Sequence, residues 1–262
     1  MNLLITGAVS GIGKAAAEYF TQRGHTVYGT DLSPADINGV CCFSADITDA
    51  DSLLKVKNHL QMNNIVLDAI INIAGIHMMA SLVESDYRKM KQVIDVNLAG
   101  TMLVNRTFHE CLAKGGRIII VTSEVAGFDP MPFNGLYNVA KTALDSYAQA
   151  LRQELNLIGQ RVVTIRPGAV ETPLSSGSMT ATQTLADTTA LYAKQAKNFA
   201  GLAAKFMGTP IKPEILAALI YKATTARHPK LIYKKHQNTG LVLLNTLPKR
   251  LQCAVIKLLL SL

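Results

Sequence analysis

Short apolar runs rich in Val, Ile and Leu alternate with longer amphipathic stretches along most of this chain. That alternation is typical of a parallel sheet whose two faces are covered by helices. We expect seven strands, at residues 3–6, 26–31, 40–44, 67–72, 117–122, 161–166 and 231–233. Helices are expected at residues 11–22, 49–61, 86–112, 136–157 and 213–225. The pattern therefore predicts an α/β fold with a doubly wound parallel sheet.

The chain length favours one folded unit over several. A sequence of 262 residues with 49% hydrophobic and 17% charged residues is long and apolar enough to bury one large core. We therefore expect a single domain over residues 1–262. Residues 173–211 interrupt the alternation, and an insertion of that length is typical of a lid.

The expected lid contains a helical spacing of apolar residues. Tyr192, Ala196, Phe199, Ala203 and Phe206 recur at steps of four and three, which places them on one helix face. That face either covers an apolar substrate or only packs on the domain core. The lid is dominated by apolar side chains, namely those of Met179, Leu191, Tyr192, Phe199 and Phe206. An apolar substrate therefore fits better than a sugar, a phosphate or a carboxylate.

A glycine-rich turn follows the first expected strand and opens the first expected helix. Small residues at this place let a pyrophosphate approach the backbone amides at the helix N-terminus. A glycine-rich turn alone is a weak signal, but its position between strand and helix strengthens it. The expected cofactor contacts are Gly7, Ser10, Gly11, Ile12 and Gly13.

Asp31 ends the second expected strand, about 20 residues after Gly11. A carboxylate there can accept hydrogen bonds from the ribose hydroxyls of NAD, and it would repel the 2'-phosphate of NADP. No Lys or Arg stands at Val9, Ser10, Leu32 or Ser33 to offset that repulsion. NAD is therefore favoured over NADP, unless Asp31 is only a solvated turn residue.

Tyr137 and Lys141 are four residues apart in an expected helix, so their side chains share one face. The pKa of a free phenol is about 10, which is too high for proton transfer at neutral pH. A nearby ammonium and an oxidised nicotinamide would both favour the phenolate. Tyr137 is therefore the candidate for proton transfer, with Lys141 tuning its pKa.

These residues occur with others in a characteristic order. The turn at residues 6–13 is followed by Asp46, Asn72-Ile73-Ala74-Gly75, Asn97, Ser123, Tyr137-Asn138-Val139-Ala140-Lys141 and Arg166-Pro167-Gly168. Over residues 1 to about 235 the chain resembles the short-chain dehydrogenase/reductase superfamily, which has a Rossmann-type fold. The short stretch Pro132-Phe133-Asn134 and the apolar lid lean toward hydroxysteroid or retinol dehydrogenase-like members.

The resemblance implies a role for each matching residue. Asp46 would contact the adenine, Lys141 would also bind the nicotinamide ribose, and Thr172 would hold the carboxamide. Asn97 would bend its helix and keep a water in a proton relay, or would only kink the helix. Further cofactor contacts implied by the resemblance are Ile47, Asn72, Ala74, Gly75, Tyr137, Pro167, Gly168 and Val170. Dimers or tetramers are also typical of the family.

The catalytic serine depends on how the residues are counted. The family's usual spacing back from Tyr137 falls on Glu124, whereas the count forward along the strand at 117–122 falls on Ser123. A strand fixes the direction of its side chains, while the loop 125–136 can absorb an insertion. Ser123 is therefore chosen to hydrogen-bond the substrate oxygen, and Glu124 is expected at the pocket rim.

Together these features predict an NAD-dependent oxidoreductase that interconverts an apolar alcohol and its ketone or aldehyde. In oxidation Tyr137 would take the hydroxyl proton, and in reduction it would return that proton. Steroids, retinoids and long-chain alcohols are all compatible substrates. The alternatives are a 3-oxoacyl reductase, which would ordinarily use NADPH, and a non-catalytic dinucleotide sensor, which would not require both Tyr137 and Lys141.

Charge is unevenly distributed along the chain. Residues 1–190 hold 14 Lys and Arg against 17 Asp and Glu, whereas residues 191–262 hold 12 against 1. No nucleic-acid-binding motif accompanies the charge, so we expect no nucleic-acid partner. Residues 241–262 are apolar but interrupted by basic residues, and this segment is expected either to contact an anionic membrane surface or to pack on the lid or a second subunit.

The N-terminal residues and the cysteines carry no targeting or metal signal. A strand-like run begins directly after Met1, so we expect no signal peptide and a cytoplasmic location, with membrane contact at the surface only. The four cysteines fit neither a disulfide framework nor metal-ligand spacing. We expect them to be reduced, buried and inert, and we expect no bound metal.

Overall fold

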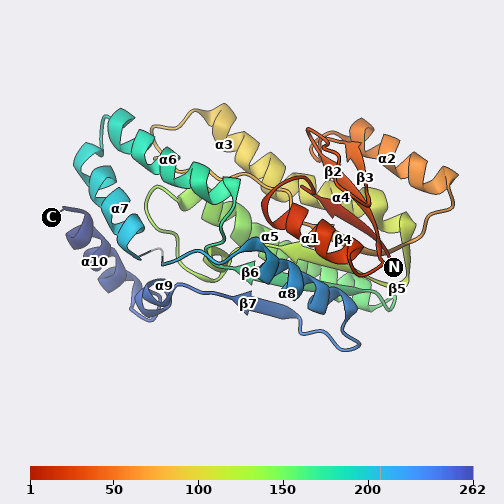
Figure 1. Ribbon diagram of the computed structural model, residues 1–262. Coiled ribbons are helices and arrows are strands. Elements are labelled where there is room, and N and C mark those ends of the chain that lie inside the picture. Colours follow the sequence, from red (N-terminus) through yellow and green to blue (C-terminus); the bar gives the residue numbers. More distant parts are fainter. Residues whose placement is uncertain (207, 262) are drawn as a thin grey trace.

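The computed structural model describes residues 1–206 and 208–261, except for the side chains of residues 179, 205 and 206. One parallel sheet of seven strands forms its centre, in the order β3-β2-β1-β4-β5-β6-β7 (Figure 1). The strands are β1 Asn2–Thr6, β2 Thr26–Asp31, β3 Val40–Ser44, β4 Leu67–Asn72, β5 Leu112–Val121, β6 Arg161–Pro167 and β7 Ile232–Lys235. This confirms the predicted α/β fold of Rossmann type and all seven strands.

Helices cover both faces of the sheet, and each face has its own apolar core. On one face, α1 (Gly11–Thr21) and α8 (Pro213–Thr225) pack over the strands through residues such as Phe20 and Leu216. On the other, α2 (Ala50–Met62), α4 (Thr101–Phe108) and α5 (Gly135–Asn156) bury residues such as Phe108 and Leu144. The central strands are apolar on both sides because both of their faces are buried.

The helix predicted at residues 86–112 is not continuous. It is divided into α3 (Tyr87–Ile94), a π-helical turn at Asp95–Gly100, α4 and a 3₁₀ turn at His109–Cys111. Strand β5 begins at Leu112, five residues before the predicted start, because Leu112 pairs with Leu67 across a register shift. A buried side-chain amide in the π-helical turn interrupts the helix, as described below.

The lid and the C-terminal segment are helical and pack on each other. The lid consists of α6 (Pro173–Thr188) and α7 (Ala193–Phe206), and the C-terminal segment of α9 (Thr239–Leu244) and α10 (Lys249–Ser261). All four lie beyond one end of the sheet (Figure 1). Helices α6, α7 and α10 share a third apolar cluster with the loop before α5, which includes Phe133, Ala196, Phe199 and Leu260.

The third cluster shows what the predicted lid face packs against. Tyr192, Ala196, Phe199 and Ala203 all belong to it, so they share one packed face as predicted. Their neighbours are Phe133 and α10 rather than the two sheet cores. The side chains of Met179 and Phe206 lie outside the described part of the chain.

The predicted burial of the cysteines was wrong for three of the four. Cys41 and Cys253 are exposed and Cys42 is half-buried, so only Cys111 is buried as predicted; all four are free thiols. The short strand β3 lies at the sheet edge, which leaves Cys41 outside the core.

No helix in the described residues is long and apolar enough to cross a membrane.

Candidate active site

The glycine-rich turn joins β1 to α1 and is held by close backbone contacts. Gly7 and Gly11 have φ angles of 68° and 48°, in the left-handed region that favours glycine. A Cβ atom on Gly13 would lie 1.9 Å from the Gly7 carbonyl oxygen. The turn therefore tolerates no side chain at Gly13, and it leaves the first amides of α1 facing a cavity that a pyrophosphate fits.

The end of β4 is tied to the same turn. The Thr6 hydroxyl oxygen accepts hydrogen bonds from the amides of Ile73 and Ala74, at 3.1 and 3.2 Å. Asn72 does not line the cavity as predicted. Its side-chain amide donates to Asn105 Oδ1 at 2.8 Å beneath the sheet edge, so it joins β4 to α4. Asn72 therefore supports the site by holding β4 to α4 and does not line the cavity.

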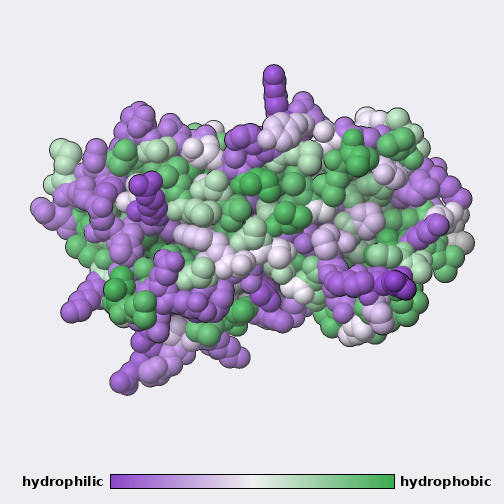
Figure 2. Space-filling view, turned by 180° about the vertical axis from the view of Figure 1, so that it is seen from behind, coloured by the Kyte–Doolittle hydropathy of each residue, from purple (hydrophilic) through white to green (hydrophobic). Residues whose placement is uncertain are grey.

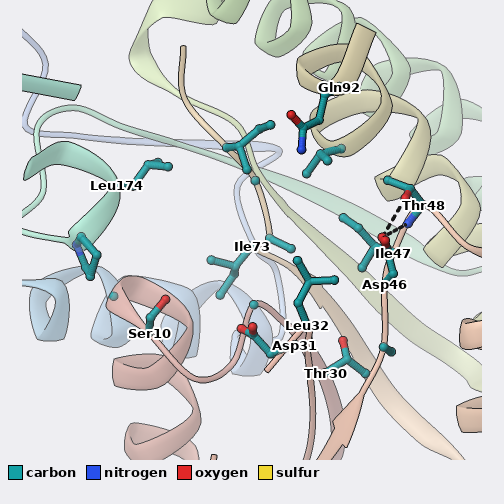
Figure 3. A pocket seen from close by; sticks show the side chains of 18 of the residues that line it. Ser10, Thr30, Asp31, Leu32, Asp46, Ile47, Thr48, Ile73, Gln92 and Leu174 are labelled. Carbon is teal, nitrogen blue, oxygen red and sulfur yellow. Dashed lines mark hydrogen bonds between the residues drawn. The ribbon is translucent and has the colours of Figure 1, made fainter. Parts of the chain in front are cut away.

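A cavity of about 440 Å³ opens near the carboxyl ends of β1 and β4 (Figure 3). Strands β2 and β3 lie on one side of β1 and β4 to β7 on the other, and this switch in strand order is the usual ligand site of such sheets. Asp31 and Asp46 line its lower side, and the Asp46 carboxylate accepts hydrogen bonds from the Thr48 amide and hydroxyl. Most predicted cofactor residues meet here, namely Gly7, Ser10, Gly11, Ile12, Asp31, Asp46, Ile47, Ala74, Gly75 and Thr172.

Arg88 and Gln92 are among the lining residues that were not predicted from the sequence. Both belong to α3, and Figure 3 shows Gln92 on the side of the cavity opposite Ser10 of the glycine turn. Arg88 is the one Lys or Arg among the residues described as lining this cavity. The spacing of 88 and 92 along a helix face could have indicated them, since residues four apart share a face.

Asn97 lies in the π-helical turn between α3 and α4 and is fully buried. Its amide nitrogen donates to the carbonyl oxygens of Ile76 and Val93, at 2.8 and 3.0 Å, and its oxygen accepts from the Ile76 amide. These bonds accompany the π-helical turn, which interrupts the regular helical hydrogen bonding at the residue where a local bend was predicted. They also fix the loop after β4 against the helix.

Ser123, Tyr137 and Lys141 meet at a second cavity of about 160 Å³ beside the first. Ser123 follows β5, Tyr137 lies in the first turn of α5, and Lys141 follows one turn later. Ser123 and Tyr137 line the same cavity, and the Lys141 ammonium lies 5.7 Å from the centre of the Tyr137 ring. Pro167, Gly168 and Val170 line the same cavity, as predicted, and Ile12, Gly75 and Thr172 line both cavities.

Burial dominates the protonation of this group. It raises the pKa of Tyr137 to about 12, against a smaller lowering by the Ser123 hydrogen bond. It also lowers the pKa of Lys141 to about 8. The predicted tuning of Tyr137 by Lys141 is therefore outweighed by burial. The phenol is neutral at pH 7, and an added positive charge in the adjoining cavity would favour the phenolate.

The structure resolves the ambiguity between the two adjacent candidates for the serine position. Ser123 lines the cavity, whereas Glu124 is buried and turned away from it. The Glu124 carboxylate accepts a hydrogen bond of 2.6 Å from the Asn238 amide, just after β7. The predicted position of Glu124 at the pocket rim is therefore wrong. Its carboxylate fixes the C-terminal segment instead, and burial raises its pKa.

His77 is a site residue that the sequence did not indicate. It lines the second cavity, and its ring centre lies 4.4 Å from that of Tyr137. Its Nε2 atom is 3.0 Å from Asn134 Oδ1, while Nδ1 is buried without a hydrogen-bond partner. Burial lowers the pKa of His77 to about 4, so the ring is neutral at pH 7. Its place two residues after Gly75, at the carboxyl end of β4, was the available signal.

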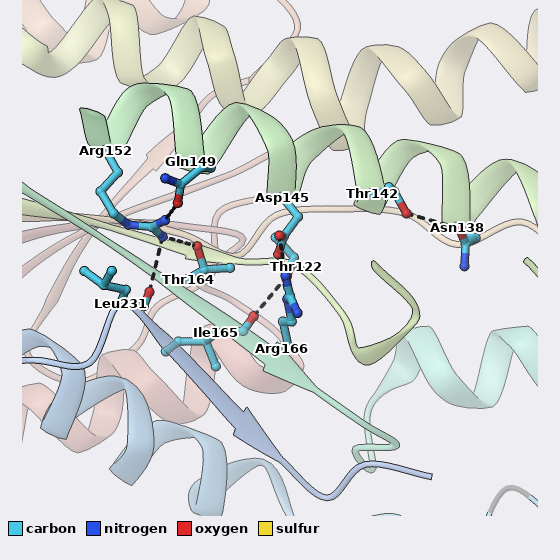
Figure 4. Close-up of polar contacts among 10 residues, drawn as sticks. All are labelled: Thr122, Asn138, Thr142, Asp145, Gln149, Arg152, Thr164, Ile165, Arg166 and Leu231. Atoms are coloured by element: carbon cyan, nitrogen blue, oxygen red, sulfur yellow. Dashed lines mark hydrogen bonds and ion pairs between the residues drawn. The ribbon is translucent and has the colours of Figure 1, made fainter. Parts of the chain in front are cut away.

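Helix α5 carries Tyr137 and Lys141 and is fastened to β6 by two arginines (Figure 4). Arg166 of β6 forms a bidentate ion pair with Asp145 of α5, at 2.8 and 2.6 Å. Arg152 of α5 donates to the Val162 carbonyl oxygen at 2.9 Å and to Thr164 Oγ1 at 2.8 Å. These bonds fix the position of α5 along the sheet, and with it the height of Tyr137 above the strand ends.

The loop before α5 connects the catalytic helix to the lid. Phe133 has a φ angle of 66°, which is unusual for a bulky residue, and its carbonyl oxygen accepts a hydrogen bond from the Ala80 amide at 2.7 Å. This backbone turns its ring into the third apolar cluster, in edge contact with Tyr192 and Phe199. The lid is therefore joined through Phe133 to a point four residues from Tyr137.

The lid is also fastened at its tip. The Glu84 carboxylate, in the loop before α3, accepts hydrogen bonds from the Thr189 hydroxyl and from the amides of Ala190 and Leu191, at 2.5, 2.8 and 3.0 Å. On the side of α3 and α5 the lid is thus attached through a polar contact at Glu84 and an apolar one at Phe133. Between them it borders the cavity that holds Ser123 and Tyr137, which Leu174, Ser175 and Ser178 of α6 also line.

Fold and site together define a class of protein: an α/β domain with a dinucleotide-sized cavity and an adjoining Ser-Tyr-Lys group. The family model described as short chain dehydrogenase matches residues 1–183. The chain belongs to this family of NAD(P)-dependent oxidoreductases, which confirms the superfamily predicted from the motifs.

Named relatives share the matched part of the chain. It is 32% identical over 188 residues to the NADPH-dependent 1-acyldihydroxyacetone phosphate reductase of Schizosaccharomyces pombe, and 28% identical over 173 residues to the 3-ketodihydrosphingosine reductase of Bacteroides thetaiotaomicron. The matches cover 68% and 65% of this chain and 64% of each relative. They span somewhat less than two thirds of those proteins.

A solved structure confirms the fold over a longer stretch. A short chain dehydrogenase family protein from Francisella tularensis superposes with a TM-score of 0.74 at 24% identity, covering 89% of this chain and 96% of that one. At this identity the likeness concerns the fold alone. The predicted lean toward hydroxysteroid or retinol dehydrogenases is not specifically supported by these relatives.

Proposed function

We propose that the protein is an NAD-dependent oxidoreductase that interconverts an apolar alcohol and its ketone or aldehyde. The observation that carries the proposal is the position of Tyr137. Together with Ser123 and Lys141 it lines a cavity that shares Ile12, Gly75 and Thr172 with the larger cavity. A substrate whose oxygen is held by Ser123 and Tyr137 would therefore adjoin a dinucleotide held in the larger cavity, which would supply the hydride chemistry.

The residues of the larger cavity fit a dinucleotide, since a turn that excludes even a Cβ at Gly13 leaves room for a pyrophosphate. When bound, the nicotinamide accepts or gives the hydride. Ser123 hydrogen-bonds the substrate oxygen, and Tyr137 takes its proton in oxidation or returns it in reduction. Lys141 and Asn97 would hold the ribose and an ordered water of the proton relay. The neutral phenol in the ligand-free protein is already in the form that reduction requires.

The proposed preference for NAD depends on Asp31, at the tip of β2 in the larger cavity. A carboxylate there accepts ribose hydroxyl hydrogen bonds and repels a 2'-phosphate. Arg88 lines the same cavity from α3 and provides the competing charge, and the S. pombe relative is named NADPH-dependent. Of the two groups, Asp31 lies on the strand that usually contacts the adenosine ribose, so NAD is favoured.

An apolar substrate is supported by the apolar side chains of Ile73, Val121 and Leu174, which line the cavity that holds Tyr137. The names of both relatives denote ketones of acyl or sphingoid lipids, in line with a long apolar substrate. Steroid-, retinoid- and long-chain alcohol-like molecules all fit this description. A 3-oxoacyl reductase is the alternative enzyme, and its usual NADPH requirement conflicts with Asp31.

We also propose that the protein forms a homodimer, and from it a tetramer where a second face pairs. Helices α4 and α5 enclose an open hollow on the surface, lined by the apolar residues Met102, Leu103 and Leu151. A second copy would cover this hollow with the same helices, as two-fold symmetry requires. Sedimentation velocity of the wild type and of Met102→Glu tests this, with a shift to monomer expected for the variant.

The test of the catalytic proposal is turnover of long-chain and cyclic secondary and primary alcohols with NAD and NADP, followed through the absorbance of the reduced nicotinamide. Higher kcat/KM with NAD on an apolar alcohol is expected. If NADP gives the higher value, the assignment of Asp31 is wrong, and Arg88→Ala then shows whether Arg88 binds the 2'-phosphate. Nucleotide binding without turnover of any alcohol or ketone would favour the non-catalytic sensor.

A further inference from the structure

The C-terminal helix α10 has two apolar faces, and only one of them is covered. Ile256 and Leu260 point into the third apolar cluster, where Asn198 of α7 donates a hydrogen bond of 3.0 Å to the Leu260 carbonyl oxygen. Leu251, Leu258 and Leu259 are 49%, 62% and 44% exposed. At 100° per residue, Leu251 and Leu258 lie on the same side of the helix, opposite Leu260. A surface helix of a soluble domain normally has polar residues on that side.

The neighbouring short helix extends this apolar surface. In α9, Val242 and Leu243 are 43% and 69% exposed, and Gln252 of α10 donates to the Leu244 carbonyl oxygen at 3.2 Å. The two helices are thus joined. Figure 2 shows hydrophobic and hydrophilic side chains intermixed at the end of the molecule where α7, α9 and α10 lie. We call the exposed apolar residues of α9 and α10, namely Val242, Leu243, Leu251, Leu258 and Leu259, the C-terminal apolar surface.

Positive charge surrounds this surface. Arg250 and Lys257 of α10 are exposed and lie beside the face that carries Leu251 and Leu258, and Lys194 and Lys197 are exposed on α7, the helix that packs against α10. Residues 191–262 hold 12 Lys and Arg and a single Asp or Glu. An exposed apolar face bordered by cations is the pattern of a helix that lies in the interface of an anionic membrane.

The same charge argues against a second copy of the chain as the occupant. Self-association through this surface would bring two strongly basic regions together, with almost no acidic residue from the segment to pair with them. An anionic lipid surface offers both a phosphate or carboxylate layer for the cations and an acyl layer for the leucines. We propose that the C-terminal apolar surface binds anionic membranes and sets the lid against the bilayer.

The proposal deepens the function proposed above and rests on it for its purpose. The third apolar cluster runs from the inner face of α10 through Phe199 to Phe133, four residues from Tyr137. A membrane at the outer face of α10 would therefore lie next to the apolar cluster that packs the lid, and α6 of that lid lines the substrate cavity with Leu174. An apolar alcohol or ketone dissolved in the bilayer could reach the site without passing through bulk water.

The test measures binding of the full-length protein to vesicles of phosphatidylcholine alone and of phosphatidylcholine with 30% phosphatidylserine, by co-sedimentation. We expect binding to the anionic vesicles at least ~10-fold tighter, falling as salt is raised. The double variant Leu251→Ser/Leu258→Ser should lose roughly 10-fold or more of this affinity. Leu157→Ser is the matched control, since Leu157 is 86% exposed at the far end of α5.

Charge variants separate the cations from the apolar residues and guard against misfolding. Arg250→Gln/Lys257→Gln should reduce binding to the anionic vesicles several-fold, while Lys14→Gln, an exposed residue of α1, should not. Kinetics on a short water-soluble alcohol should be unchanged in every variant. A general loss of function would thus be distinguished from a loss of membrane binding.

Three results would overturn the proposal. One is equal affinity of the wild type for neutral and anionic vesicles, or none for either. Another is equal binding by the Leu251/Leu258 and Leu157 variants. The last is a change in sedimentation coefficient of the Leu251/Leu258 variant from dimer to monomer, which would identify the surface as a subunit interface. If membrane binding holds but no alcohol is turned over, only the proposed function fails.

Discussion

At the nucleotide end of the sheet, a methyl group on Gly13 would overlap the Gly7 carbonyl oxygen; at the lid end, one on Gly201 of α7 would meet no atom within 4 Å. The first region is built from backbone that approaches backbone, with two left-handed glycines and the Thr6 hydroxyl holding the end of β4. The second is built from side chains of distant segments, in which Phe133, Phe199 and Leu260 meet.

This difference indicates which part of the site has a rigid shape and which part can accept other side chains. Backbone contacts allow almost no change of residue, so the nucleotide cavity has one geometry and one class of ligand. Apolar side-chain contacts can be replaced by others of similar volume at small cost. We therefore expect substitutions at the lid end to change substrate specificity more readily than nucleotide binding.

The largest effect is expected where the two regions meet, at Tyr137. Tyr137→Phe should lower kcat by about 10³-fold, because the phenol is the group that exchanges the substrate proton. Nucleotide affinity, measured by fluorescence titration, should change little. Tyr192→Phe is the matched control, since Tyr192 contributes only its ring to the lid cluster. Full activity of Tyr137→Phe would contradict the assigned site.

The nucleotide end is tested by Gly13→Ala. The added methyl forces the turn apart at the Gly7 carbonyl, which should cost about 3 kcal/mol of folding free energy and weaken nucleotide binding by more than ~10-fold. Chemical unfolding and fluorescence titration measure the two effects. A variant with wild-type stability and affinity would show that this turn is less rigid than its geometry implies.

Whether the tight packing extends to the buried ring beside Tyr137 is tested by pH. The folded-state pKa of His77 is about 4, below the unfolded value of about 6.5, so folding favours the neutral ring. The stability that this provides is complete above pH 6.5 and is lost as the pH falls through 4. Relative to pH 7, the wild type should lose about 3 kcal/mol at pH 4 from this residue.

The comparison protein for this pH test is His77→Phe, which keeps an aromatic ring against Tyr137 but cannot bind a proton. Urea unfolding of both proteins at pH 7, 5.5 and 4 should show the wild type losing stability more steeply. Parallel pH profiles would mean that His77 is free to protonate in the folded state, and that this part of the site is open to water.

The smallest effect is expected at the lid end, and it has the opposite sign. Gly201→Ala should raise the free energy of unfolding by about 0.5–1 kcal/mol, because alanine favours the helix and nothing obstructs its methyl group. Thermal melts measure the change, and activity should be retained. A destabilised Gly201→Ala variant would show that α7 packs more closely around Gly201 than its open surroundings indicate.

The same division explains what the sequence could predict. Hydrophobic alternation and the order of motifs were sufficient for the seven strands, the glycine turn and the Ser123-Tyr137-Lys141 group. Each of these depends on local chain geometry. The choice of Ser123 over Glu124 succeeded for the same reason, because strand β5 fixes which way each side chain points.

Features that depend on contacts between distant segments were not predicted. His77 gains its role from Asn134 and Tyr137, and Arg88 gains its place from the position of α3 over the nucleotide cavity. Asn72 was expected at the cofactor, but Asn105 draws its amide beneath the sheet. The pKa of Tyr137 was misjudged too, because the sequence shows the nearby Lys141 but not the burial that outweighs it.

The hydrogen bond between Glu124 and Asn238 limits where this chain can be shortened. The residue next to the catalytic Ser123 holds its carboxylate in the interior only because the backbone after β7 is there to receive it. Ending the chain before Asn238 would leave that buried carboxylate without this hydrogen bond. A truncated variant would therefore have to keep Asn238 or replace Glu124.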